Sequence, residues 1–271
     1  MPIAPWRATA LALLLAAVAC QPANTPAPAP GPVSVQPPRP VYTSGEEVIT
    51  AMRDRYAGRW YRSLVFTQKT GQRTAAGTWT TQTWYEALRL PGRLRIDFDP
   101  LKSGTGVLYA RDSQYVFANG KVTRADAGIN DLLLLGFDVY ANTTGRTAAL
   151  LRGQGVNLAR VHRDSLEGRP MIVVGALPGD LRSKQFWIDA ERLYFVRLVE
   201  PSPRDTSKTQ DIRFVNYQRF GDAWVASRVE LYNDGVLVFT EDYSDIRTDV
   251  PLDDALFDPA RWRSAKHWLP Q

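Results

Sequence analysis

The stretch that most constrains the fold runs from Arg89 to Thr123, where apolar and polar residues alternate in short runs broken by turn residues. Leu94, Ile96 and Phe98 share one face of an extended chain, and the polar residues between them share the other. A helix cannot place residues with this period of two on one side. Asn119-Gly120 is a dipeptide suited to a tight hairpin turn. The stretch therefore predicts three antiparallel strands.

The rest of the chain extends this pattern. Alternation and turn residues predict further strands at 61–68, 77–90, 156–163, 170–175, 182–189, 193–200, 208–218, 223–232 and 235–246. Around 193–199 and 236–239 both faces of the strand are apolar, which is not expected where one face meets water. Helices should therefore cover one side of the sheet, and a core or an apolar cavity should fill the other. We expect one antiparallel, barrel-like sheet of about ten or eleven strands.

Helices are predicted in two places. Ser44-Gly45-Glu46-Glu47 forms a capping box, and the apolar residues after it fall on one stripe as far as Tyr56. A second, short helix is predicted from Arg146 to Arg152. Between them lies an apolar run that fits no amphipathic stripe, made of Leu132, Leu133, Leu134, Leu135 and Phe137. This run forms either a fully buried helix turn or a lid or plug over an apolar cavity.

Residues 1–19 have the form of a secretory signal. A single charge, Arg7, precedes an apolar run that is too short to remain as a membrane-spanning helix. The run ends in Ala17-Val18-Ala19-Cys20, and small residues before a lone cysteine resemble the bacterial lipobox, in which Cys20 would carry the lipid. Ordinary cleavage near Ala19 beside an incidental cysteine is the alternative. Cys20 is the only cysteine, so no intramolecular disulfide and no cysteine-based metal site can form.

The next segment has the composition of a tether. Residues 21–40 hold eight of the nineteen prolines and almost nothing that could be buried. At ~3.1 Å per residue, extended polyproline II could hold a domain up to ~60 Å from a membrane. Gln21, in place of Asp, follows the cysteine, which by resemblance to the enterobacterial sorting rule points to the outer membrane. We expect a lipidated tether over 20–43, a β domain over 44–260 and a C-terminal tail over 261–271.

Composition and charge limit the classes of function. A chain of 271 residues with 44% hydrophobic residues can bury the core of one large β domain. A net charge of +5 permits attraction to anionic lipid or nucleic acid without demanding either. The tryptophans could stack sugars or bases, but no Lys or Arg register around them tracks a phosphate backbone. We therefore expect most tryptophans in the core and no nucleic-acid partner.

Motifs for catalysis are missing from the sequence. The chain has two histidines, His162 and His267, and no Gly-x-Ser-x-Gly elbow, His-Glu-x-x-His, dinucleotide-binding motif or P-loop. Asp97 and Asp99 share one face of a strand and could form a carboxylate pair or bind a cation. Ion pairing with arginines on the same face, Arg95 among them, is the interpretation we favour. We expect no catalytic residue, no metal site, no cofactor and no enzymatic activity.

Several motifs together resemble the LolA/LolB family of lipoprotein carriers. They are the Pro91-Gly92 turn, the Arg-x-Arg-x-Asp-x-Asp-Pro strand from Arg93 to Pro100, the hairpin ending in Asn119-Gly120-Lys121, and the later Trp187-Ile188-Asp189, Phe214 to Tyr217, Trp224, Tyr243 to Ile246 and Leu256-Phe257. The similarity covers roughly residues 44 to 260. It implies a mainly β (α+β) fold, an unclosed antiparallel β-barrel with an N-terminal helix and with short helices covering or plugging an apolar cavity for acyl chains.

The resemblance also implies a site and a function. Such a barrel would direct Trp84, Ile96 and Phe98 into the cavity and place Leu132, Leu133, Leu134, Leu135 and Phe137 at its mouth. We expect a bacterial lipoprotein, anchored by acyl chains on Cys20 at the outer membrane and facing the periplasm. It would bind lipid or lipoprotein acyl chains in lipoprotein or lipid trafficking or in envelope maintenance. The alternatives are a non-carrier sensing or accessory module of an envelope complex, with a protein partner, and an envelope hydrolase, which would need a cleft with titratable groups of shifted pKa.

Overall fold

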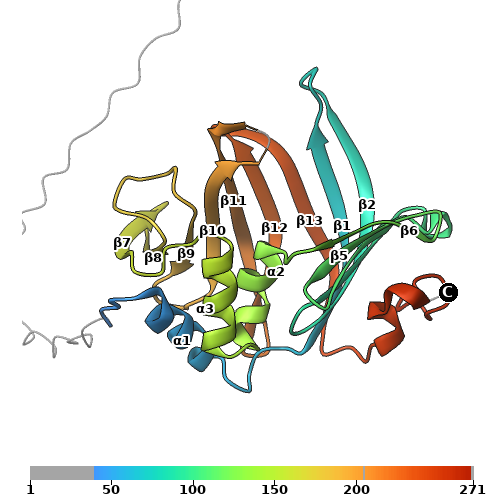
Figure 1. The fold of residues 1–271 in the computed structure, drawn as a ribbon, viewed down its shortest axis with the longest axis horizontal. Coiled ribbons are helices and arrows are strands. Elements are labelled where there is room, and N and C mark those ends of the chain that lie inside the picture. The colour runs from blue at the N-terminus through green and yellow to red at the C-terminus, as the bar shows by residue number, and fades with distance from the viewer. Residues whose placement is uncertain (1–39, 204, 270–271) are drawn as a thin grey trace, which may run out of the picture. The chain divides into compact units, whose positions relative to one another are not determined.

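The computed structural model describes residues 40–203 and 205–269, and the folded unit begins at Val41. The expected signal peptide, Cys20 and nearly all of the Pro-rich segment lie outside the described residues. The strands are β1 (Ser63–Arg73), β2 (Trp79–Arg89), β3 (Arg93–Phe98), β4 (Gly106–Ala110), β5 (Ser113–Ala118), β6 (Lys121–Ala127), β7 (Val161–Leu166), β8 (Arg169–Val174), β9 (Gln185–Asp189), β10 (Phe195–Ser202), β11 (Asp205–Phe220), β12 (Ala223–Asn233) and β13 (Val236–Thr248) (Figure 1).

These strands form one antiparallel sheet in the order β6-β5-β4-β3-β2-β1-β13-β12-β11-β10-β9-β8-β7. In the part of the chain that the structure describes, β6 and β7 are the two edges and do not pair with each other, so the barrel is not closed. The expected unclosed antiparallel β-barrel is confirmed. The sheet has thirteen strands, one more than the twelve segments that the sequence pattern marked and more than the ten or eleven expected for the barrel. One strand that the pattern missed is β6, whose residues are all exposed and therefore show no apolar alternation.

Three helices and a short 3-10 turn cover the inner face of the sheet, over the strands from β9 to β12 (Figure 1). They are α1 (Gly45–Arg55), α2 (Asp131–Gly136), η2 (Asp138–Tyr140) and α3 (Thr144–Gly153). The Ser44 side chain caps α1 by accepting a hydrogen bond from the Glu47 N–H at 3.3 Å. The Glu47 carboxylate accepts from the Thr43 N–H at 2.7 Å, one residue before the partner that a capping box predicts. None of the helices in 40–203 and 205–269 combines the length and apolarity that a bilayer crossing requires.

The C-terminal segment covers the opposite face of the sheet. It contains η3 (Asp254–Phe257) and η4 (Pro259–Arg261), and with Val65, Leu108 and Phe117 it forms a second, smaller core. Trp262 is 3% exposed, and its ring stacks on Phe117 at a centroid distance of 4.0 Å. The residues after 260 thus pack on the sheet as far as they are described. The remaining 3-10 turn of the described residues, η1 (Leu101–Ser103), connects β3 to β4.

A buried ion pair lies beneath this C-terminal segment. Arg95 Nε and Nη2 donate to the two carboxylate oxygens of Asp97 at 2.7 and 2.9 Å. Arg95 Nη2 also donates to the Trp262 carbonyl at 3.0 Å, and its guanidinium lies 3.9 Å from the centre of the Trp262 ring. The pairing expected along the strand is therefore confirmed for Arg95 and Asp97. The same pair fastens the C-terminal segment to the outer face.

Candidate functional site

The leucine run forms helix α2, which is seated tightly on the sheet. Asn130 Oδ1 caps the helix by accepting hydrogen bonds from the N–H groups of Leu132 and Leu133 at 2.9 and 3.0 Å. Gly136 ends it against Phe214, and a Cβ at this glycine would meet the Phe214 ring at 2.8 Å. This close approach requires glycine, because any side chain would push the helix off the strand.

The run is divided between the core and a cavity. Leu135 and Phe137 belong to the main core, where Phe137 packs edge-on against Phe214. Leu132 is partly buried against the same core. Leu133 and Leu134 are buried in the same core and also line a cavity of about 290 Å³. The run is thus a buried helix turn, and two of its leucines border an open space.

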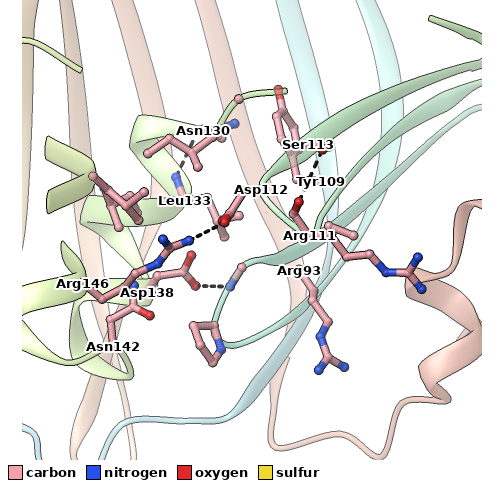
Figure 2. Close-up of a pocket in the computed structure, with 17 residues that line it drawn as sticks. Arg93, Tyr109, Arg111, Asp112, Ser113, Asn130, Leu133, Asp138, Asn142 and Arg146 are labelled. Atoms are coloured by element: carbon pink, nitrogen blue, oxygen red, sulfur yellow. Dashed lines mark hydrogen bonds and ion pairs between the residues drawn. The ribbon is translucent and has the colours of Figure 1, made fainter. Parts of the chain in front are cut away.

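This cavity, which we call the lid cavity, lies between the segment 131–153 and the rim formed by the β2–β3 and β4–β5 turns (Figure 2). Apolar groups supply much of its lining, and they are Pro91, Tyr109, Ile129, Leu133, Leu134 and Leu150. Polar side chains of the lining include Asn130, Asp138 and Asn142, together with Asp112 and Arg146. The lid cavity is thus an apolar space with a polar rim.

Two polar contacts join the segment 131–153 to the rim. The Gly92 N–H donates to Asp138 Oδ1 at 2.9 Å, and Arg146 forms an ion pair with Asp112 (Figure 2). Burial raises the pKa of Asp138 to about 7. The hydrogen bond from Gly92 opposes this increase in pKa, and the negative charge of Asp112 adds to the increase. The Arg146–Asp112 pair is exposed, so it contributes little to stability.

Trp84, Ile96 and Phe98 occupy a separate place on the inner face. Trp84 pairs with Phe98 in the β2–β3 register, with ring centroids 4.7 Å apart, and Phe239 lies 6.2 Å from Trp84. All four side chains are partly exposed. They do not line the lid cavity. Of the eight predicted cavity residues, the five of the leucine run pack in the core, two of these also line the lid cavity, and the other three lie apart on the inner face.

Sequence reasoning missed three polar residues on the same inner face, Gln68 on β1, Glu86 on β2 and Glu241 on β13. Burial raises the pKa of Glu86 well above its usual value, and the charge of Glu241 adds to the effect. Burial likewise raises the pKa of Glu241 to about 7, against hydrogen bonds from Tyr243 and Gln68. One signal in the sequence could have found Glu86, since it occupies an inward position between Trp84 and Leu88 on a strand whose other inward residues there are apolar.

Comparison with known proteins identifies the fold. No family model matches the chain, and no curated protein sequence matches it either. A DUF1329 family protein from Desulfovibrio piger has a similar structure, with a TM-score of 0.54 and 15% identity over 81% of this chain and 98% of that chain. A putative outer membrane lipoprotein-sorting protein domain from Vibrio parahaemolyticus gives a TM-score of 0.53 and 15% identity over 81% and 98% of the two chains.

A LolA superfamily protein from Nitrosomonas europaea also aligns, with a TM-score of 0.49 and 12% identity over 78% of this chain and 97% of that chain. Identities this low carry no residue roles from one protein to another. The first two alignments nonetheless span almost the full length of the matched structures. The described part of this chain therefore shares the fold of these two solved structures, and in this chain that fold is an unclosed antiparallel sheet, as its sequence motifs indicated.

Proposed function

We propose that this protein is a lipoprotein, anchored through Cys20 at the outer membrane and facing the periplasm, that binds acyl chains of lipids or lipoproteins. It would serve lipoprotein or lipid trafficking or envelope maintenance. The observation that carries the proposal is the lid cavity, in which Leu133 and Leu134 face an apolar space beneath a short helix in an open-barrel fold. A solved domain with this fold is described as lipoprotein-sorting, which supports the same class of ligand.

The size of the lid cavity bears on how a ligand would enter. Its volume of about 290 Å³ is at the lower limit of ligand sites, which span roughly 300–1,000 Å³. Removing hydrocarbon from water contributes ~0.8 kcal/mol per CH₂. Each further methylene that enters the lid cavity therefore favours a conformation in which the cavity is larger. We propose that the segment 131–153 moves away from the rim as the chain enters. The contacts that would break are the Gly92–Asp138 hydrogen bond and the exposed Arg146–Asp112 pair.

Filling the lid cavity should abolish acyl binding without unfolding the protein. Leu150 is half-buried and lines the cavity, so Leu150→Trp adds volume where space exists. We expect this variant to bind a fluorescent fatty acid at least about tenfold more weakly than the parent chain from Gln21 onward, a loss of ~1.4 kcal/mol or more. Probe fluorescence measures the affinity, and circular dichroism checks the fold.

Leu177→Trp is the matched control, because Leu177 is 56% exposed and lies outside the lid cavity. It should bind the probe like the parent chain. Equal affinity of Leu150→Trp and the parent would show that the acyl site is elsewhere. A parent chain that binds no acyl probe would contradict the proposed function itself.

Membrane anchoring should depend on Cys20. It is the only cysteine in the chain and lies outside the described residues. Cys20→Ser should lose all labelling by radioactive palmitate in cells and should move from the membrane fraction to the soluble fraction. Persistent labelling of the variant, or a wild-type protein recovered in the soluble fraction, would contradict the lipoprotein proposal.

A further inference from the structure

Gln68, Glu86 and Glu241 converge on the inner face of the sheet. Gln68 pairs with Trp84 on one side and with Tyr243 on the other, so it is the diagonal neighbour of Glu86 on β2 and of Glu241 on β13. Diagonal neighbours on one face of a sheet are within reach of long side chains. The Gln68 amide hydrogen-bonds to Glu241, and the two carboxyls interact electrostatically. We call these three residues the inner acceptor cluster.

The acceptors of this cluster are largely unused. Glu86 is 6% exposed and has no hydrogen-bond donor among the described residues. Gln68 is completely buried, and its Oε1 atom also lacks a donor there, while its Nε2 donates to Thr70 at 2.8 Å. Glu241 accepts hydrogen bonds from the Tyr243 hydroxyl, at 2.5 Å, and from the Gln68 amide. Gln68 Oε1 is therefore a buried acceptor without a donor, which is rare in native proteins because it costs free energy.

Positive charge is also missing around the cluster. In residues 40–203 and 205–269, neither Glu86 nor Glu241 forms an ion pair. The titratable groups that face the carboxyls from neighbouring strands are phenols, Tyr109 near Glu86 and Tyr243 near Glu241. A buried carboxylate needs a cation or a proton to offset its desolvation. The cluster therefore fits a ligand that brings both positive charge and N–H donors.

The surroundings of the cluster are apolar, and the aromatic rings beyond it are partly exposed. Phe66 stacks on Tyr243 at a centroid distance of 4.1 Å, and Ile96 lies opposite Glu86 in the β2–β3 register. The partly exposed rings of Trp84, Phe98 and Phe239 continue this face beyond the cluster. Hydrocarbon laid along these rings would leave water.

We infer that the inner face binds a long-chain amphiphile whose head group is a primary ammonium. A primary ammonium has three N–H donors, and the cluster offers three acceptor groups, the two carboxylates and Gln68 Oε1. The alkyl chain of the ligand lies against the aromatic rings of β2, β3 and β13. This site is separate from the lid cavity, and the inference shares with the proposed function the class of ligand, a long hydrocarbon chain.

Three probes with the same alkyl chain test the inference at pH 8. Dodecylammonium has charge and N–H donors, dodecyltrimethylammonium has charge alone, and dodecanoate has the opposite charge. Calorimetry on the chain from Gln21 onward should show dodecylammonium binding at least about tenfold more tightly than either of the others, as charge-assisted hydrogen bonds predict. Glu86→Gln and Glu241→Gln should each remove this preference. Glu167→Gln, at an exposed glutamate outside the cluster, should keep it.

A second measurement needs no substitution. Lowering the pH from 8 to 5 protonates Glu241, because burial raises its pKa to about 7, and burial raises the pKa of Glu86 in the same direction. The preference for dodecylammonium over dodecyltrimethylammonium should then disappear. Equal binding of all three probes at pH 8, or a preference that survives in both Gln variants or at pH 5, would overturn the inference and leave acyl binding intact. Failure of every probe to bind would overturn the proposed function as well.

Discussion

Replacing Arg95 with Met should lower the free energy of unfolding by about 3–5 kcal/mol, the range measured when one partner of a buried ion pair is removed. The side chains of Arg95 and Asp97 are only 4% and 6% exposed, and two hydrogen bonds join them. Without Arg95, His267, at 3.4 Å, is the only possible cationic partner of the Asp97 carboxylate among the described residues. The substitution also removes the hydrogen bond to the Trp262 carbonyl, so the C-terminal segment should loosen with it. Urea unfolding followed by circular dichroism measures the loss.

Arg93→Met provides the matched control. Arg93 is on the same strand and pairs with Asp254, but both side chains are substantially exposed. Exposed pairs are worth about 0–1 kcal/mol, so this variant should unfold close to the parent. The double variant Arg95→Met, Asp97→Leu should recover much of the stability, because an apolar pair leaves no uncompensated charge. If Arg95→Met is no less stable than Arg93→Met, the buried pair does not hold the outer face together.

The protein should be more stable near pH 5 than at pH 8, by on the order of 4 kcal/mol. Burial raises the pKa of Asp138 and of Glu241 to about 7 each, and raises that of Glu86 as well. In the unfolded chain these carboxyls titrate near their ordinary values of about 4. Between those values and pH 7 the folded state holds more protons than the unfolded state, so stability falls as pH rises through this window. Ionising the buried carboxyls in the native state causes the loss.

Carboxyls whose pKa is lowered in the folded state limit the stability of the protein at acid pH. Burial opposes the shift at Asp97, but hydrogen bonds from His267 and Arg95 lower its pKa, and side-chain and backbone hydrogen bonds from Ser183 lower that of Asp180 to about 2. Their stabilising effect is present above the pKa of the unfolded chain and is lost only in stronger acid.

Urea midpoints at pH 5 and pH 8 measure the predicted loss of stability at the higher pH. The triple variant Asp138→Asn, Glu86→Gln, Glu241→Gln should flatten the profile and be the more stable protein at pH 8. Equal midpoints for the wild type would contradict the assignment of these carboxyls.

Much of the sheet could be predicted because its strands show in the local sequence as an alternation of apolar and polar residues. Leu94, Ile96 and Phe98 do share a face, and Arg95 and Asp97 are two residues apart on the other, so their pairing needed no long-range information. The edge strand β6 has only exposed residues, and without a buried face it leaves no apolar period to recognise. A strand can be recognised from its sequence pattern where one of its faces is buried, but not where both faces are exposed.

The candidate site was less predictable because its parts meet through tertiary contacts. The leucine run signals burial, but only its packing against the sheet and the rim decides that Leu133 and Leu134, and not Leu135, also line a cavity. Glu86 and Glu241 come from strands far apart in the sequence, and although the inward position of Glu86 is visible locally, its proximity to Glu241 is not. Trp262 likewise covers the sheet through partners, such as Phe117, that are far away along the chain. No local window contains these neighbours.

The strand order also has a consequence for how the molecule assembles. Every pairing in the described sheet joins consecutive strands except one, between β1 and β13. Two hairpin arrays, β1–β6 and β7–β13, can therefore form quickly from local contacts, whereas joining them requires closing a loop that includes nearly the whole domain. The lid cavity has walls from β3 and β4 and a cover that packs on β10. We therefore expect a newly made chain to acquire its ligand site only in this last and slowest folding step, when its first and last strands meet.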